Sequence, residues 1–151
     1  MKFITGDIFK GKEQVFVHGC NCFNSFGAGI AFAVLHTYPR AYYDVDGLTK
    51  RGDVSKLGTY SHWVGKHRFY DQEITIVNAY TQYSFQKPQI EVSLDYDALE
   101  SVMKLIRTDF SDKSIAMPRI GAGLAGGDWN RILGILETVF DGKEDVTVYS
   151  L

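Results

Sequence analysis

Two glycine-rich segments of the chain have the composition of phosphate-binding loops. The first loop is Gly27-Ala28-Gly29, and the second loop is Gly121-Ala122-Gly123-Leu124-Ala125-Gly126-Gly127. Small residues let a backbone approach a ligand closely, and a helix that follows directs unpaired N–H groups and its positive dipole end at an anion. Two such loops predict a site for the two phosphates of one pyrophosphate. The alternative is that the glycines only form tight turns between strands and helices.

The second loop also has the Gly-x-Gly-x-x-Gly spacing of dinucleotide-binding Rossmann domains, from Gly121 to Gly126. In those domains the motif follows the first strand, and further βα units bind the second nucleotide half. Here only one helix and one strand are predicted after the motif, although Glu144 and Asp145 lie near the offset of the ribose-binding acid. We therefore rank a Rossmann domain below a phosphate site built from both loops.

Two residues near the loops are candidates for proton transfer. Asp128 follows the second loop, where its carboxylate either caps the next helix or acts as a general base on water. The capping preferences of aspartate favour the structural role. His18 lies before Asn21 and is either a buried, hydrogen-bonded side chain or an acid that protonates a leaving oxygen.

His18, Cys20 and Cys22 alternate, and in a continuous strand they would share one face. We nevertheless expect no metal site, because metal ligands usually come from separate segments and no second pair matches this one. Both cysteines are interpreted as small buried hydrophobic residues. The motif segments contain no Ser-His-Asp set, P-loop lysine or Gly-x-Ser-x-Gly turn. Any hydrolysis is therefore expected to be metal-free and to need no cofactor.

The pattern of apolar residues predicts the elements that position these loops. Short β-prone runs indicate strands, and longer runs with apolar residues three and four apart indicate helices. The predicted strands are 3–5, 15–18, 59–64, 69–80, 114–117 and 146–151. The predicted helices are 30–38, 92–110 and 130–140, with a polar loop over 44–56. This alternation predicts one α/β domain over residues 1–151, with helices packed on a mostly parallel sheet.

Composition narrows the partners and the compartment. The chain has 16 basic and 18 acidic side chains and a formal net charge of −2, which argues against duplex DNA or a membrane surface as the main partner. The chain contains no apolar run near the length of a membrane span, and its first residues do not resemble a signal peptide. Two closely spaced cysteines do not form a secreted disulfide framework, so a cytoplasmic location is expected.

Five short segments, in order along the chain, resemble the macro-domain family. They are Thr5-Gly6-Asp7-Ile8, Val17-His18-Gly19-Cys20-Asn21, Gly27-Ala28-Gly29-Ile30-Ala31, Pro118-Arg119-Ile120-Gly121-Ala122-Gly123-Leu124 and Val146-Thr147-Val148-Tyr149-Ser150-Leu151. The last resembles the closing strand of the terminal ADP-ribose protein glycohydrolase branch. The resemblance implies a three-layer α/β/α sandwich with a mixed, mostly parallel sheet.

The resemblance also implies an ADP-ribose site. Asp7 would accept from the adenine amino group with Ile8 beside it, and Tyr149 and Leu151 would line the adenine pocket. Asn21 would bind a hydroxyl of the distal ribose. The pyrophosphate would lie between the two loops, which are Gly27, Ala28, Gly29 and Ile30 on one side and Ile120, Gly121, Ala122, Gly123, Leu124 and Ala125 on the other.

The chain departs from branches of the family that cleave ADP-ribosyl esters. Those branches use a lysine in the middle strand and an aspartate after the second Gly-x-Gly-Leu. When the chain is aligned on Lys87-Pro88, the lysine position falls near Thr81 and the aspartate position on Ala125. His18 replaces the first asparagine of the family's Asn-Ala-Ala-Asn segment. A covalent lysine mechanism is therefore not expected.

Two functions remain open from the sequence. The first is a metal-independent hydrolase that removes a group from the distal ribose of ADP-ribose. A 1″-phosphate is the favoured substrate, ahead of ADP-ribosyl or O-acetyl-ADP-ribose esters, with Asp128 and His18 as the catalytic candidates. The second is a non-catalytic reader of ADP-ribose. The partner in either case is ADP-ribose or a derivative, free or linked to protein or nucleic acid.

Overall fold

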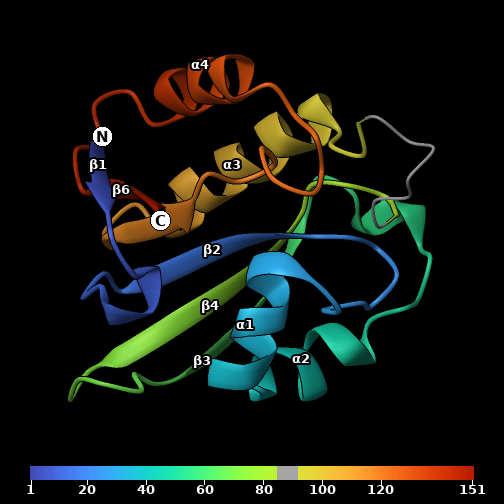
Figure 1. Cartoon of the computed structure of the whole chain (residues 1–151), viewed down its shortest axis with the longest axis horizontal. Helices are drawn as coiled ribbons and strands as arrows, with labels where there is room; N and C mark the ends of the chain where they lie inside the picture. Colours follow the sequence, from blue (N-terminus) through green and yellow to red (C-terminus); the bar gives the residue numbers. More distant parts are fainter. Residues whose placement is uncertain (85–91) are drawn as a thin grey trace.

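A computed structural model of the chain describes residues 1–84 and 92–151 as a sheet between two layers of helices (Figure 1). The strands are β1 (Lys2–Thr5), β2 (Val15–Cys20), β3 (Tyr60–Lys66), β4 (Glu73–Tyr80), β5 (Ile115–Pro118) and β6 (Val146–Ser150). The helices are α1 (Gly29–Thr37), α2 (Arg40–Tyr43), α3 (Tyr96–Asp109) and α4 (Trp129–Val139), with 3-10 turns at Ile8–Lys10, Asp46–Leu48 and Val54–Lys56. The expected three-layer α/β/α sandwich is confirmed.

The six strands form one mixed sheet in the order β1-β6-β5-β2-β4-β3. All neighbouring pairs are parallel except β3 and β4, which form an antiparallel hairpin. The first strand lies at an edge, and the second loop follows the fifth strand, so the motif does not open a nucleotide-binding half as it does in a Rossmann domain. The strand order therefore excludes the Rossmann domain, which the sequence had only ranked lower.

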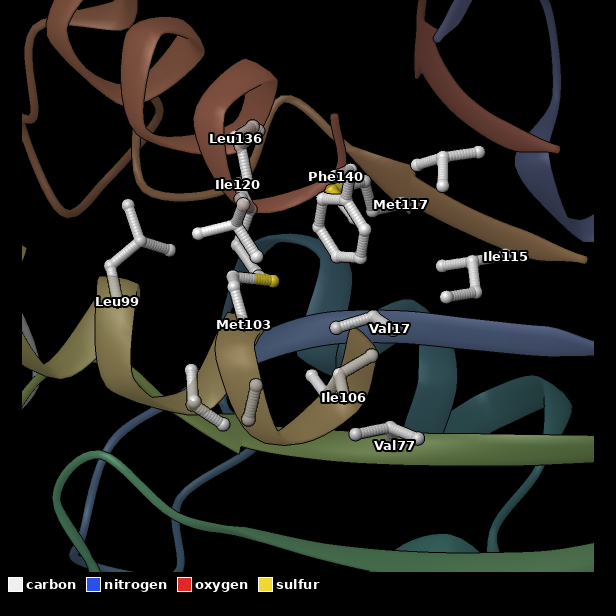
Figure 2. Packing of buried hydrophobic residues seen from close by; sticks show 14 of the residues in the cluster. Val17, Val77, Leu99, Met103, Ile106, Ile115, Met117, Ile120, Leu136 and Phe140 are labelled. Atoms are coloured by element: carbon white, nitrogen blue, oxygen red, sulfur yellow. The ribbon is translucent and has the colours of Figure 1, made fainter. Parts of the chain in front are cut away.

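Each face of the sheet is covered by a different pair of helices. On one face, α3 and α4 pack on β2, β4, β5 and β6, and Figure 2 shows Leu99, Met103 and Leu136 pointing toward Val17 and Met117. All five of these side chains are 0% exposed. On the other face α1 and α2 cover a second buried cluster. Burial of both faces explains why the central strands are almost continuously apolar rather than alternating.

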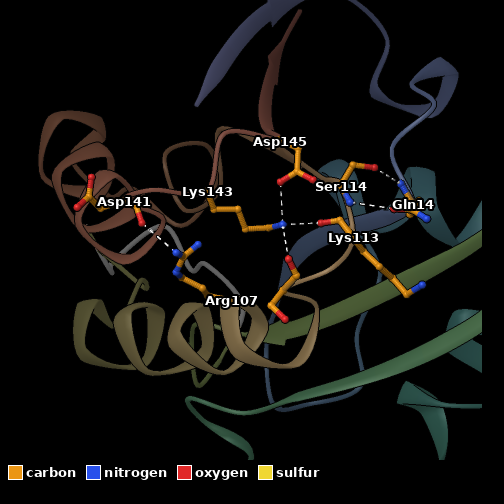
Figure 3. A network of polar contacts seen from close by, with 8 residues as sticks. Gln14, Arg107, Lys113, Ser114, Asp141, Lys143 and Asp145 are labelled. Carbon is orange, nitrogen blue, oxygen red and sulfur yellow. Dashed lines mark hydrogen bonds and ion pairs between the residues drawn. The ribbon is translucent and has the colours of Figure 1, made fainter.

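The amino ends of the central strands are held together by polar side chains (Figure 3). The buried Lys143 ammonium donates to Asp145 Oδ1 at 2.7 Å and to the Lys113 carbonyl at 2.7 Å, which joins the starts of β5 and β6. Gln14 and Ser114 exchange two hydrogen bonds of 3.0 Å, each side chain binding the other's backbone, and join the starts of β2 and β5. This polar region leaves the opposite, carboxyl ends free for a site.

Two predicted elements begin later than the sequence pattern suggests. The predicted strand 69–80 begins at Glu73, because the backbone of His67 donates to Gln72 and closes the hairpin there. The predicted helix 92–110 begins at Tyr96. Asp95 caps this helix, while the N–H groups of Ser93 and Leu94 both donate to the Ala125 carbonyl in the second loop. The periodicity of apolar residues predicted a first helical turn here, but these hydrogen bonds to Ala125 hold the segment outside the helix.

Candidate functional site

A cavity of about 790 Å³ lies at the carboxyl ends of β2, β4 and β5. Its lining combines backbone from both glycine loops with small and apolar side chains. The lining residues are Gly19, Cys20, Asn21, Ser25, Gly27, Ala28, Gly29, Ile30, Ala31, Thr81, Gln82, Pro118, Arg119, Ile120, Gly121, Gly123, Leu124 and Ala125. Its size falls in the range of small-molecule and cofactor sites. Most of the residues predicted to hold a pyrophosphate thus meet in one place.

The cavity lies where the chain changes direction across the sheet. After β2 the chain passes to α1 on one face, whereas after the neighbouring strand β5 it passes to α4 on the other face. The two connections diverge and leave a crevice between them. In open α/β sheets this point, beyond the carboxyl ends of the strands, is where ligands bind.

The first loop opens directly onto the start of α1. Within the described residues, the backbone N–H groups of Ala28, Gly29, Ile30 and Ala31 have no protein acceptor. The N-cap of α1 is Ala28, which supplies no side-chain hydrogen bond, and the first turn contains no acidic residue. Unsatisfied donors together with the positive end of a helix dipole are the features by which helix starts bind anions.

The second loop is supported mainly by bonds within itself. The N–H of Gly126 donates to the Gly123 carbonyl at 3.0 Å, and the N–H of Gly127 donates to the Gly121 carbonyl at 2.8 Å. In the described part of the chain, the N–H groups of Gly123, Leu124 and Ala125 donate to no protein acceptor. All three residues line the cavity, as do Ala28, Gly29, Ile30 and Ala31, so both loops bring unpaired backbone donors to its lining.

Glycine is required at particular points of these loops. Gly29 and Gly121 have φ values of +61° and +78°, which L side chains rarely adopt. A Cβ on Gly127 would lie 2.7 Å from the Gly121 carbonyl oxygen. By contrast, a Cβ on Gly123 would meet nothing within 4 Å, so this position is open toward the cavity. Some of the glycines are therefore required by the turn, whereas Gly123 is required by neither the backbone conformation nor its neighbours.

Asp128 occupies the N-cap of α4. Its Oδ1 accepts from the backbone N–H of Asn130 at 3.0 Å, and its own N–H donates to the Tyr96 hydroxyl at 2.9 Å. Asp128 is exposed and does not line the cavity. The capping interpretation is confirmed, and the start of α4 is therefore already satisfied, unlike the start of α1.

His18 lies beneath the cavity and does not line it. The ring is 0% exposed and packs edge-on against Phe26, while its Nε2 lies 2.7 Å from Asn78 Oδ1. Burial lowers the pKa of His18 to about 4, and the hydrogen bond to Asn78 opposes part of that shift. The ring is therefore neutral at pH 7, as expected for a buried, hydrogen-bonded histidine. Because the ring does not line the cavity, it cannot donate a proton directly to a ligand there.

A chain of hydrogen-bonded polar groups, buried except for the partly exposed Ser61, continues from His18 into the protein. Asn78 Nδ2 donates to Ser61 Oγ at 3.2 Å, Ser61 Oγ lies 2.8 Å from the Tyr80 hydroxyl, and Tyr80 donates to Asp46 Oδ1 at 2.7 Å. Burial raises the pKa of the Asp46 carboxyl, with the Tyr80 hydrogen bond opposing the shift. This chain anchors α2 and the 46–48 turn below the cavity rather than supplying a group within it.

Asn21 lines the cavity, but its amide organises the approach to the first loop. Oδ1 accepts from the N–H groups of Phe23 and Ser25 at 2.9 and 3.4 Å, and Nδ2 donates to the Ser25 carbonyl at 3.1 Å. Binding of a ribose hydroxyl by Asn21 stays a prediction. It would use the second hydrogen of Nδ2, or it would replace one of the hydrogen bonds just described.

The predicted adenine residues lie together at the β1–β6 edge, outside the cavity lining. Asp7 is exposed and caps the 3-10 turn that begins at Ile8, by accepting from Phe9 N–H at 3.0 Å. The Tyr149 hydroxyl donates to Glu13 Oε1 at 2.5 Å, and burial together with this bond raises the pKa of Tyr149. Leu151 is fully exposed. Gly6 N–H binds the Ser150 carbonyl, which brings Asp7 beside the end of β6.

Several lining residues escaped the sequence interpretation, including Gly19, Ser25, Gln82 and Ala31. A usable signal existed for Thr81 and Gln82, because they directly follow β4, whose carboxyl end adjoins that of the parallel strand β2. Ala122 is part of the second loop but does not line the cavity. Lys87-Pro88, on which the family alignment was based, lies outside the described residues.

Both cysteines are buried and unpaired with one another. Burial raises the pKa of Cys20 well above its ordinary value, so this thiol, which reaches the cavity lining, is protonated and poorly nucleophilic. Across residues 1–84 and 92–151 no cluster of three or more His, Cys, Asp or Glu side chains is placed to hold a metal. No helix in the same ranges is long and apolar enough to cross a membrane.

Curated relatives cover almost the whole chain, whereas no protein-family model matches it. A 17.5 kDa protein from the tk-vs intergenic region of enterobacteria phage T4 is 36% identical over 98% of this chain and 95% of its own. An ADP-ribose 1″-phosphate phosphatase of Saccharomyces cerevisiae is 24% identical over 99% of this chain and 97% of its own. The DNA ADP-ribosyl glycohydrolase of Mycobacterium tuberculosis is 25% identical over 94% of this chain, which spans 39% of that protein.

Solved structures share the fold. The macrodomain of Mycobacterium tuberculosis DarG matches with a TM-score of 0.77 and 22% identity, over 99% of this chain and 97% of its own. Thermosipho africanus DarTG in complex with ADP-ribose matches with a TM-score of 0.74 and 17% identity, over 98% of this chain and 41% of that one. The ordered motifs, the sheet order and the fold shared with the DarG macrodomain agree with the similarity to ADP-ribose 1″-phosphate phosphatases over nearly the whole chain, so the chain belongs to the macro-domain family.

Proposed function

We propose that the protein binds ADP-ribose or a derivative in this cavity, with the diphosphate between the two glycine loops. The observation that carries the proposal is that both loops bring unpartnered amides to the lining of one cavity. Within the described residues, the N–H groups of Ala28–Ala31 and Gly123–Ala125 have no protein acceptor, and all of these residues line the cavity. Backbone donors bind phosphate without a formal charge, which fits a chain with a net charge of −2. The relatives named above as ADP-ribose-processing proteins support the same ligand.

The strand order gives the ligand a direction. Asp7 and Tyr149 lie toward β1 and β6, the loops lie over β5 and β2, and β4 lies beyond them. We therefore place adenine toward the β1–β6 edge and the distal ribose toward β4. The exposed Asp7 carboxylate is an acceptor only, so it suits the exocyclic amine of adenine and disfavours the carbonyl of guanine.

This orientation is tested with Asp7→Asn rather than Asp7→Ala. Asparagine caps about as well as aspartate, so the 3-10 turn is kept while the charge is lost. When Oδ1 stays on the cap, the Nδ2 group that replaces the second oxygen is a donor and cannot accept from the adenine amine. We therefore expect ADP-ribose affinity, measured by calorimetry, to fall roughly ten- to a hundredfold, the equivalent of one charge-assisted hydrogen bond. Asp53→Asn is the matched control, because Asp53 is also exposed and caps a 3-10 turn, by accepting from Ser55 N–H at 2.9 Å. Equal affinity in both variants would remove Asp7 from the site.

For activity, we propose hydrolysis of a group on the distal ribose, with ADP-ribose 1″-phosphate as the first substrate to test and ADP-ribosyl or O-acetyl esters next. The loop amides would offset negative charge that develops in the transition state. Asp128 adjoins the second loop, and only one of its carboxylate oxygens is engaged by the cap. It is therefore retained as the candidate base, whereas the buried His18 is not carried forward as the acid.

Catalysis is tested with Asp128→Asn and ADP-ribose 1″-phosphate as substrate. Asparagine preserves the cap, so we expect unchanged stability and ADP-ribose affinity, with turnover reduced at least about tenfold. Unchanged turnover would exclude Asp128 as the base and would leave positioning by the loop amides as the source of rate enhancement.

The cavity lining favours a second candidate function, a non-catalytic reader of free or macromolecule-linked ADP-ribose. Among the described lining residues there is no Asp, Glu, His or Lys, and Arg119 is the one charged side chain. Tight ADP-ribose binding without product from any ADP-ribose ester would establish the reader. Phosphate release from the 1″-phosphate by the wild-type protein would exclude it.

A further inference from the structure

Thr81 is the first residue after β4, and its backbone is held from both sides. Its N–H donates to the Cys20 carbonyl at 3.2 Å, and its carbonyl accepts from the Asp95 N–H at 2.9 Å. The side chain is 1% exposed and lines the cavity. Its position is therefore set by β2, β4 and the start of α3 and does not depend on a ligand.

The Thr81 hydroxyl lies beside two other residues of the cavity lining, Gly19 and Ile120. A Cβ on Gly19 would lie 2.9 Å from Thr81 Oγ1 and 3.2 Å from Ile120 Cγ1. The missing side chain at Gly19 thus leaves the hydroxyl room beside the backbone of β2. A larger residue there would cover the hydroxyl or displace it from this position.

This hydroxyl has no hydrogen-bond partner within the described residues, unlike that of Thr59, which donates to the Lys56 carbonyl at 2.6 Å. Asp46 Oδ2 is the one side-chain oxygen or nitrogen of those residues that is both sealed from solvent and unpartnered. The Thr81 hydroxyl is therefore open to the cavity. An unpartnered, almost fully buried polar group that faces a cavity gains most from a ligand that supplies the missing bond.

We propose that the Thr81 hydroxyl binds the distal ribose of the ligand and determines specificity at that end. Thr81 comes from β4, on the far side of the loops from Asp7 and Tyr149, so it faces the part of the ligand beyond the diphosphate. A hydroxyl both donates and accepts, which suits a ribose hydroxyl or a phosphoryl oxygen attached to it. This inference rests on the proposed binding of ADP-ribose and adds the residue that distinguishes ADP-ribose from ADP.

The test compares two ligands across four proteins by calorimetric titration. Thr81→Val removes the hydroxyl and keeps the shape, whereas Thr81→Ser keeps the hydroxyl. Thr75→Val is the matched control, because Thr75 lies on β4, the strand that Thr81 follows, is 4% exposed and does not line the cavity. We expect Thr81→Val to weaken ADP-ribose roughly three- to tenfold and to change ADP affinity less than about twofold. Thr81→Ser and Thr75→Val should match the wild type with both ligands.

Three outcomes would overturn the proposal, and they are distinguishable. Wild-type ADP-ribose affinity in Thr81→Val would show that the hydroxyl does not touch the ligand. Equal weakening of ADP and ADP-ribose would show a structural role for the side chain. Wild-type protein that binds neither ligand would overturn the proposed function itself, and this inference with it. Thermal unfolding of each variant checks that the fold is kept.

Discussion

The two glycine loops have similar sequences but differ in the hydrogen bonds that their backbones make. The first loop has no side-chain cap and leads straight into α1, whose first amides remain free at the cavity. The second loop closes on itself through the Gly126 and Gly127 amides, and α4 begins only after Asp128 has capped it. The same small residues thus leave unpaired amides at a helix start in one loop and within the loop itself in the other. Glycine spacing does not distinguish these cases; the position of the cap does.

The largest expected effect concerns His18, which lies on the strand that leads to the first loop. Its pKa is lowered to about 4, so between pH 6.5 and 4 the unfolded chain takes up a proton that the folded protein does not. Above pH 6.5 the ring is mostly neutral in both states, so it does not lower the free energy of unfolding. As the pH falls to 4, protonation of the unfolded chain should lower the free energy of unfolding by about 3 kcal/mol.

Urea unfolding of the wild type and of His18→Gln at pH 7, 5.5 and 4 measures this loss. The difference between the two proteins should shrink by that amount, because the variant carries no ring to protonate. A parallel pH dependence in both proteins would mean that His18 titrates normally. In that case the ring would be protonated in the folded protein below about pH 6.5, and the interpretation of His18 as a neutral, buried group beneath the first loop would be wrong.

The next effect tests the open position of the second loop. Gly123→Glu should weaken ADP-ribose at least about a hundredfold, because a carboxylate then faces the diphosphate, and like charges across an interface cost several kcal/mol. Stability should change by less than about 0.5 kcal/mol, since a Cβ there meets nothing within 4 Å. Gly134→Glu on α4 is the control, because it is equally open and does not line the cavity. Retained binding in Gly123→Glu would place the diphosphate away from this loop.

A capping side chain introduced at Ala28 should give the start of α1 the capped state that Asp128 gives the start of α4. Ala28 has the extended backbone of an N-cap, with φ −153° and ψ 162°. Ala28→Asp should stabilise the protein by about 1 kcal/mol, because it supplies the missing cap. ADP-ribose affinity should fall roughly tenfold or more, since the carboxylate occupies an amide and repels the anion. A gain of stability without a loss of affinity would show that the α1 amides do not bind the ligand.

The smallest effect on binding is expected at the existing cap. Asp128→Ala should destabilise the protein by about 1 kcal/mol, whereas Asp128→Asn should be close to neutral in urea unfolding. Neither variant should change ADP-ribose affinity more than about twofold, because the capped start of α4 does not line the cavity. A marked change in affinity would mean that both helix ends contribute to the site and that the two loops are equivalent.

Local patterns were sufficient to locate most of the site. The two glycine loops, Asn21 and Ile120 line one cavity, because carboxyl ends of neighbouring parallel strands lie at the same edge of a sheet. The alternation of β-prone and helical segments likewise predicted helices packed on a mostly parallel sheet, whereas the three-layer sandwich was implied by the resemblance to macro domains. These are properties of short stretches of chain, and periodicity reports them directly.

Tertiary structure decided the properties that depend on partners distant in sequence. His18 is neutral because Phe26 and Asn78 bury and bind its ring, and the residues around it in the chain do not encode that burial. Ser93 and Leu94 join the second loop instead of α3, because the Ala125 carbonyl offers them a bond. The Thr81 hydroxyl is open to the cavity because Gly19, on the neighbouring strand β2, has no side chain to cover it. Sequence thus determined which segments surround the cavity, while packing determined which of their groups are charged, satisfied or free.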